Sequence, residues 1–233
     1  MIISHRGKYE QSLFAENSIE AFINALKKPF IQGIELDIRM TKDRVLVIHH
    51  NATIDHTSDG RGILATMTLS ELYQYNFGTV NHPSKIATLK NFLDVIDTDK
   101  EILIELKNGI ENHQIYIKKV GDLLREYPHL NIKVCSFSDS LLRIFKKKYP
   151  EFSLGKITFV QEKELPTYLQ FLSIYDKAID FNIKYPYYVW TITKKQELKH
   201  IVNQLNHNCL GIITDIPKTV ASYIKSDFPH KPE

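Results

Sequence analysis

Short apolar segments alternate with amphipathic segments along almost the whole chain. Eight of the apolar segments have the length and composition of β-strands. They are Ile2–His5, Ile34–Ile38, Ile102–Leu106, Ile132–Ser136, Ser153–Thr158, Ala178–Asn182, Tyr187–Ile192 and Gly211–Thr214. Apolar side chains at helical spacing predict helices between most of them, including one that begins after Asn17, a candidate N-cap with Glu20 three residues on.

Strands that alternate with helices predict an α/β fold in which a parallel sheet closes into a (β/α)8 barrel. An open doubly wound sheet is the alternative, but the sequence contains no glycine-rich nucleotide loop to favour it. The short stretch from Asn182 to Tyr187 leaves no room for a helix, so we expect a thin barrel wall there.

One strand pair should interrupt the alternation. The turn signal Thr41–Arg44 separates the second strand from the apolar segment Val45–Ile48, which is too close for a parallel crossover and therefore predicts an antiparallel hairpin. A turn centred on Lys42 and Asp43 would place His50 opposite Glu35. His49 would then point away from that face, in a structural role.

Residues 51 to 88, approximately, have the character of a small insertion that caps one end of the barrel. The insertion contains Tyr73, Tyr75 and Phe77, which either line a cleft or pack beneath the insertion. We expect residues 1–233 to form one domain, a distorted barrel with this hairpin and this insertion.

The composition fits one large globular domain. Of the 233 residues, 43% are hydrophobic and 24% charged. The net charge of +3 gives no general attraction to nucleic acid. Cys135 and Cys209 are too few for a disulfide framework and suggest buried thiols in a reducing compartment. Because no signal-peptide pattern or membrane-length apolar run occurs, we expect a cytoplasmic protein without stable membrane insertion. The oligomeric state is open.

Acidic side chains occupy strand positions that share one face. Glu35 and Asp37 alternate with apolar neighbours, and Glu105 shares a face with Lys107 on another strand. Buried carboxylates are costly unless a cation gathers them, and an oxygen-only ligand set suits a hard cation such as Mg²⁺ or Ca²⁺. With His5 at the end of the first strand, these residues predict a metal site with acid–base histidines at the carboxyl ends of the strands.

The motifs together closely resemble the glycerophosphodiester phosphodiesterase family of phospholipase-C-like barrels. They follow the order expected for the family over nearly the whole chain. The matching stretches are His5-Arg6-Gly7, Glu16-Asn17-Ser18, Gly33-Ile34-Glu35-Leu36-Asp37, Thr41-Lys42-Asp43, Val47 with Ile48 and His50, Thr88-Leu89, Glu105-Leu106-Lys107, Ser136-Phe137, Trp190-Thr191 and Thr214-Asp215-Ile216-Pro217.

The resemblance implies hydrolysis of glycerophosphodiesters to sn-glycerol 3-phosphate and an alcohol, with Mg²⁺, Ca²⁺ or Mn²⁺ as cofactor. By residue, it implies metal ligands at Glu35, Asp37 and Glu105, an acid–base pair at His5 and His50, phosphate contacts at Arg6 and Lys107, a substrate-side aromatic at Trp190, and a glutamate near the metal at Glu16. Water or the glycerol 2-hydroxyl would be the nucleophile, and the resemblance favours the hydroxyl, through a cyclic phosphate.

Three residues depart from the family pattern. Asn51 replaces an aspartate, His56 an arginine and Ala15 a proline. Two alternative functions remain at this point. A lysophospholipase D-like lipid phosphodiesterase would be favoured by an apolar groove in the insertion, and a non-catalytic binding barrel would be favoured by loss of the histidines or carboxylates.

Overall fold

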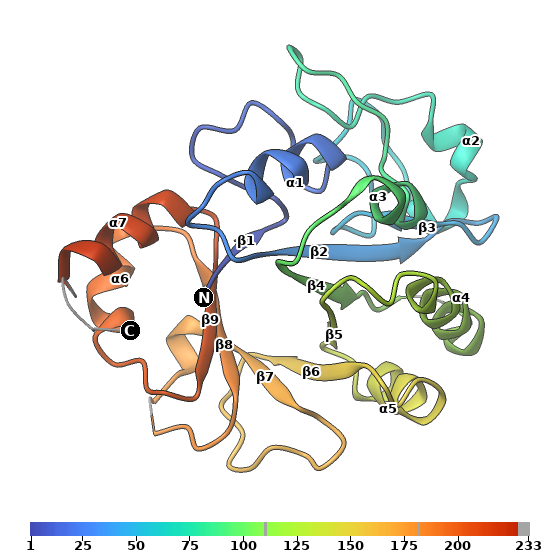
Figure 1. The fold of residues 1–233 in the computed structure, drawn as a ribbon. Helices are drawn as coiled ribbons and strands as arrows, with labels where there is room; N and C mark the ends of the chain where they lie inside the picture. The colour runs from blue at the N-terminus through green and yellow to red at the C-terminus, as the bar shows by residue number, and fades with distance from the viewer. Residues whose placement is uncertain (110, 181, 228–233) are drawn as a thin grey trace.

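Eight parallel strands close into a barrel in the computed structural model, which describes residues 1–109, 111–180 and 182–227 (Figure 1). The barrel strands are β1 (Ile2–His5), β2 (Gly33–Met40), β4 (Glu101–Leu106), β5 (Ile132–Ser136), β6 (Ser153–Thr158), β7 (Phe171–Tyr175), β8 (Tyr187–Ile192) and β9 (Cys209–Thr214). Closure comes from β1, which pairs in parallel with both β2 and β9. The short β3 (Leu46–Ile48) is antiparallel to the end of β2. The predicted distorted (β/α)8 barrel is therefore confirmed.

Helices surround the barrel and bury their apolar faces against the outer side of the strands (Figure 1). They are α1 (Ile19–Leu26), α3 (Leu89–Val95), α4 (His113–Arg125), α5 (Asp139–Lys148), α6 (Lys195–Val202) and α7 (Pro217–Asp227). The predicted N-cap of α1 was wrong by one residue. Ser18 caps the helix by accepting a hydrogen bond from the Ala21 backbone, while Asn17 adopts a positive φ of 59° and turns its side chain towards Asp37.

The predicted strand Ala178–Asn182 was wrong. The sixth barrel strand is instead Phe171–Tyr175 (β7), whose aromatic and β-branched residues suit a buried strand. Ala178 instead ends the 3-10 turn η2 (Asp176–Ala178), and Phe181 lies outside the described residues. In the part of the chain that the structure describes, loops and this turn join β6 to β7 and β7 to β8 without an α-helix, so the thin wall is wider than expected (Figure 1).

The predicted hairpin forms, but its register differs by one residue. Ile38 pairs with Ile48 and Met40 with Leu46, so the turn contains one residue more than a turn centred on Lys42 and Asp43. The Thr41 backbone N–H donates to the Val45 carbonyl, and Arg44 takes a positive φ of 63° to close the loop. Glu35 is therefore not paired with His50. The chain leaves the strand after Ile48, and this departure determines where His50 lies.

The insertion has a small hydrophobic core of its own. Between β3 and α3 lie the 3-10 helix η1 (Leu64–Thr66) and the short helix α2 (Leu69–Leu72). Phe77 is buried in this core and Tyr73 and Tyr75 pack against it. The two open interpretations of these rings are thus resolved: they pack within the insertion.

An ion pair lies among the apolar side chains inside the barrel, at the amino-terminal ends of the strands. Glu101 begins β4 and has a side chain that is only 3% exposed. Lys133 Nζ lies 2.6 Å from its Oε2, and the Tyr188 hydroxyl donates to its other oxygen. Lys133 also donates to the Tyr188 hydroxyl at 2.8 Å, so the three groups satisfy one another.

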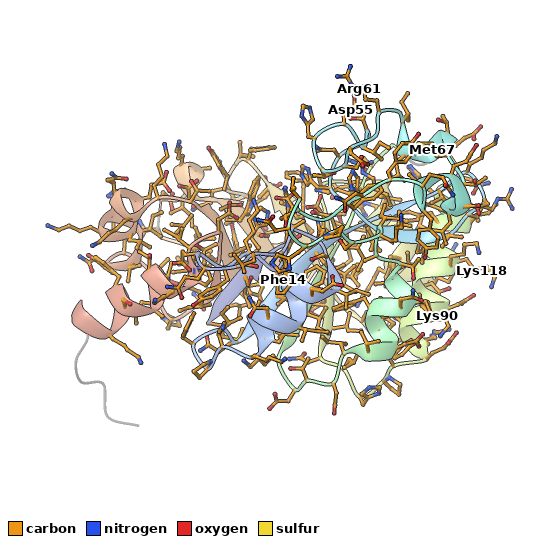
Figure 2. The ribbon with its side chains drawn as sticks, turned by 90° about the horizontal axis from the view of Figure 1, so that it is seen from above. Phe14, Asp55, Arg61, Met67, Lys90 and Lys118 are labelled. Atoms are coloured by element: carbon orange, nitrogen blue, oxygen red, sulfur yellow. The ribbon has the colours of Figure 1, made fainter. Side chains whose placement is uncertain are left out.

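Replacing Lys133 by Met should lower the free energy of unfolding by about 3 kcal/mol, because the Glu101 carboxylate would stay buried without its cation. Urea denaturation measures this loss. The matched control is Lys90→Met on the surface of α3, where the ion pair with Asp94 is exposed to solvent (Figure 2). Equal stability of the two variants would contradict a structural role for the inner ion pair.

Candidate active site

The register of three neighbouring strands brings the candidate site residues together. His5 on β1 pairs with Glu35 on β2, and Asp37 on β2 pairs with Glu105 on β4. In parallel strands, paired residues point to the same side of the sheet, here the barrel interior. Lys107 follows β4 directly, so it enters the same space from the strand end.

Glu35, Asp37 and Glu105 form a buried carboxylate cluster. One oxygen from each residue lies within 4.8 Å of the others. Lys107 Nζ lies 2.8 Å from Asp37 and 2.7 Å from Glu105, and Arg6 Nε lies 3.1 Å from Asp37. Glu35 receives a hydrogen bond from the Arg6 backbone N–H but has no lysine or arginine side chain against it among the described residues. Glu35 is thus the carboxylate of the cluster whose negative charge is least compensated by neighbouring cations.

Burial and mutual repulsion give the three carboxyl groups of this cluster different pKa values. Burial, Asp37 and Glu105 together raise the pKa of Glu35 well above its usual range. Burial and Asp37 raise the pKa of Glu105 to about 7. Burial also acts to raise the pKa of Asp37, but Lys107 and Arg6 outweigh it and hold that pKa below its usual range. Because the repulsion would be relieved by a cation touching all three groups, the donor set fits a hard divalent cation.

A chain of alternating charges connects the carboxylate cluster to His5. Arg6, which contacts Asp37, also lies 2.8 Å from Glu16. The other Glu16 oxygen lies 2.9 Å from Lys8 Nζ, which in turn lies 3.2 Å from Asp215. Glu16 therefore stands outside the carboxylate cluster and holds two cations beside it.

Asp215 is a site residue to which the sequence assigned no role. It follows β9 directly, and its Oδ1 accepts a hydrogen bond from His5 Nδ1 at 2.6 Å. With Nδ1 engaged in this way, His5 Nε2 is directed into the site, 3.9 Å from Glu35. The signal available in the sequence was its position, one residue beyond the end of a strand in the matching Thr214-Asp215 stretch.

His50 reaches the site because the hairpin strand ends early. Arg39 on β2 donates two hydrogen bonds to the His50 carbonyl and fixes the backbone there. His50 Nδ1 donates to Asn51 Oδ1 at 2.6 Å. Burial, together with Lys107 and Arg6, lowers the pKa of His50 to about 4, although Asp37 opposes the shift. His50 is therefore neutral near pH 7.

His49 is directed away from the site, as expected. It is buried, its Nε2 lies 3.0 Å from the Thr53 carbonyl oxygen, and its ring packs edge-on against Phe77 of the insertion.

Both histidines face one cleft with a polar and an aromatic wall. The cleft has an empty volume of about 450 Å³ and is lined by His5, Arg6, Glu35, His50, Glu105 and Lys107 on one side and by Phe137 and Trp190 on the other. Trp190 Nε1 donates to the Ser173 carbonyl, which fixes the indole and leaves its face apolar. Phe159 stacks on Phe137 and meets Trp190, extending the aromatic wall towards solvent. All the predicted site residues except Glu16 thus line the cleft or its carboxylate floor.

Comparison with known proteins identifies one family of enzymes. The glycerophosphoryl diester phosphodiesterase family model matches residues 5–174. A glycerophosphodiester phosphodiesterase from Caldanaerobacter subterraneus is 28% identical over 97% of this chain and 98% of its own length. A glycerophosphodiester phosphodiesterase from Bacillus altitudinis is 27% identical over 93% of this chain and 94% of its own length.

Solved structures share the fold. A phosphodiesterase from Oleispira antarctica, solved with its product sn-glycerol-3-phosphate, has a TM-score of 0.84 at 21% identity and covers 97% of this chain and 96% of its own. A putative glycerophosphoryl diester phosphodiesterase from Silicibacter pomeroyi has a TM-score of 0.82 at 19% identity and covers 97% of this chain and 93% of its own. Because the family model matches most of the chain, the protein belongs to the glycerophosphoryl diester phosphodiesterase family and is an enzyme of that family.

Proposed function

We propose that the protein hydrolyses small glycerophosphodiesters to sn-glycerol 3-phosphate and an alcohol. The observation that carries the proposal is the carboxylate cluster of Glu35, Asp37 and Glu105, buried beside Arg6 and Lys107 in a cleft with two histidines. The product bound to the Oleispira antarctica enzyme belongs to the same chemical class. We further propose that residues 1–233 act as a single catalytic domain.

The phosphodiester would lie between the two histidines. Arg6 and Lys107 both line the cleft and would bind the phosphate oxygens, where negative charge grows during the reaction. A divalent cation held by the three carboxylates would add charge neutralisation at the same oxygens. Mg²⁺, Ca²⁺ and Mn²⁺ all suit oxygen-only ligands.

His5 and His50 would exchange protons with the attacking and leaving oxygens. Each has Nδ1 held by a neighbouring oxygen, so each presents Nε2 to the cleft. Binding of the anionic phosphodiester would offset the charges of Lys107 and Arg6, two of the causes that lower the pKa of His50. Substrate binding would thus make His50 easier to protonate. The glycerol 2-hydroxyl is the favoured nucleophile.

The alternative functions have less support. A lysophospholipid would be favoured by an apolar groove in the insertion, but Tyr73, Tyr75 and Phe77 pack in its core, and most of the residues that line the groove beside it have polar side chains. A non-catalytic barrel would not require both histidines, all three carboxylates and the Asp215–His5 hydrogen bond.

We place the enzyme in the cytoplasm, because its two cysteines are free thiols. None of the described helices has the length and apolar composition needed to cross a bilayer.

Release of glycerol 3-phosphate from glycerophosphoethanolamine should require a divalent cation. Exhaustive chelation should abolish turnover, and Mg²⁺, Ca²⁺ or Mn²⁺ should restore it. Glu35→Gln should remove the metal-supported activity and leave a folded barrel, whereas Glu20→Gln on the exposed face of α1 is the matched control. A phosphodiester without glycerol serves as the poor substrate. Full activity after chelation would refute the metal assignment.

Replacing either active-site histidine by Ala should reduce turnover by about 10²- to 10⁴-fold, the usual contribution of a positioned proton-transfer group. Metal affinity should change much less, because neither histidine belongs to the carboxylate cluster. His49→Ala is the control, since this neighbouring buried histidine contacts the insertion. It should cost stability rather than chemistry. A strong effect of His49→Ala on turnover with a fully active His50→Ala variant would reverse the assignment.

Asn51→Asp tests the tuning of His50. A carboxylate against Nδ1 favours the imidazolium form, so the pKa of His50 should rise from about 4. The limb of the pH–rate profile that belongs to His50 should therefore move to higher pH by about one unit or more. The profile of kcat/KM for the two proteins measures this shift. An unchanged profile would mean that His50 does not titrate in the reaction.

A further inference from the structure

A second groove lies beside the catalytic cleft. It lies between the loop before α1 and the insertion, has an empty volume of about 1080 Å³, and opens to solvent. Two of its lining residues contact cleft residues directly: Asn51 accepts from His50 Nδ1, and Glu16 pairs with Arg6. The groove thus adjoins the proposed phosphate position on the side of His50, and a small hollow lined by Glu16, His50 and Thr57 lies between the two.

Most of the residues that line this groove have polar side chains, and two of them are acidic. The carboxylates are Glu16 and Asp59, and the side-chain amides of Asn51 and Asn76 add N–H donors. Of the described residues that line it, none is lysine or arginine. Glu16 is already paired with Arg6 and Lys8, whereas no ion pair among the described residues includes Asp59. Asp59 therefore sets the net charge of the groove.

The chain-specific residues of the site converge on the same groove. Ala15, Asn51 and His56, the three departures from the family pattern, all line it. Together they exchange a ring and two charged groups for a small side chain, an amide and an imidazole. These three departures therefore lie together on one flank of the cleft.

A glycerophosphodiester has a glycerol half and an alcohol half on either side of the phosphate. The glycerol hydroxyls would suit the carboxylate cluster and a cation held by it inside the barrel. The other arm must leave the phosphate in a different direction. We propose that the groove is the subsite for the alcohol half of the diester, and that it selects small alcohols bearing hydroxyl or ammonium groups over anionic alcohols. This inference rests on the proposed glycerophosphodiester activity.

The test compares two diesters that differ by one charge, glycerophosphoethanolamine and its N-acetyl derivative, on the metal-loaded full-length protein. Their ratio of kcat/KM should fall about 2- to 5-fold in Asp59→Asn, because an exposed carboxylate a few ångströms from an ammonium group contributes only a modest attraction. The amide keeps an oxygen to accept the Asn76 backbone N–H. Asp55→Asn is the matched control, an exposed aspartate of the insertion outside the groove (Figure 2).

Substitutions of Val80 introduce a positive or a negative charge at the groove. It lies on the groove rim and is 95% exposed, so its substitution should not affect folding. The same ratio should fall in Val80→Lys and rise in Val80→Asp, and these differences should shrink at about 0.5 M salt, where surface charges are screened.

The outcomes separate this inference from the proposed function. If the enzyme turns over both diesters but their ratio of kcat/KM is unchanged in the Asp59 and Val80 variants, the subsite proposal is overturned and the proposed function stands. A ratio that responds to Phe159→Ala instead places the alcohol on the aromatic wall and also overturns it. Absence of turnover with any glycerophosphodiester overturns the proposed function, and the subsite with it.

Discussion

The arrangement of the site depends on the free-energy cost of burying three carboxylates in the barrel interior. Strand register dictates that Glu35, Asp37 and Glu105 meet, because Asp37 pairs directly with Glu105 and Glu35 lies two residues earlier on the same face. Burial alone would drive these groups towards their neutral forms. Lys107 and Arg6 compensate Asp37 and part of Glu105, and Glu35 is left as the most poorly compensated carboxylate. This imbalance makes the carboxylate cluster a candidate cation-binding site.

A chain of ion pairs extends outward from the cluster to His5. Glu16 contacts the Arg6 guanidinium on the side away from Asp37, and its second oxygen contacts Lys8. Lys8 in turn steadies Asp215, which fixes the ring of His5. Ion pairs of this kind are partly buried, so they restrict orientation even where their net stabilisation is small. We expect a change in any one of these groups to affect the orientation of both Arg6 and His5.

Most of the fold and the central residues of the site could be predicted from the sequence, because they depend on the alternation of side chains along each strand. Glu35 and Asp37 share a face in any strand, and His5 ends an apolar segment. Other features depend on contacts between distant segments. The strand Phe171–Tyr175 was missed because an apolar segment of this length fits helix or strand equally well. Asp215 carries no signal of its own, since its role comes from closure of the barrel, which places β9 beside β1.

The hairpin shows how His50 can line the cleft although the register predicted for it was wrong. Opposite-strand pairing would place His49, not His50, across from Asp37, and indeed the His49 backbone N–H donates to the Asp37 carbonyl. Strand alternation would then direct His50 outward. Instead the strand stops at Ile48, Arg39 captures the His50 carbonyl, and Asn51 holds the imidazole. The insertion secures this bend by burying His49. It therefore does more than cap the barrel: its packing against the hairpin determines which histidine enters the cleft, and it forms one wall of the groove that begins beside that histidine.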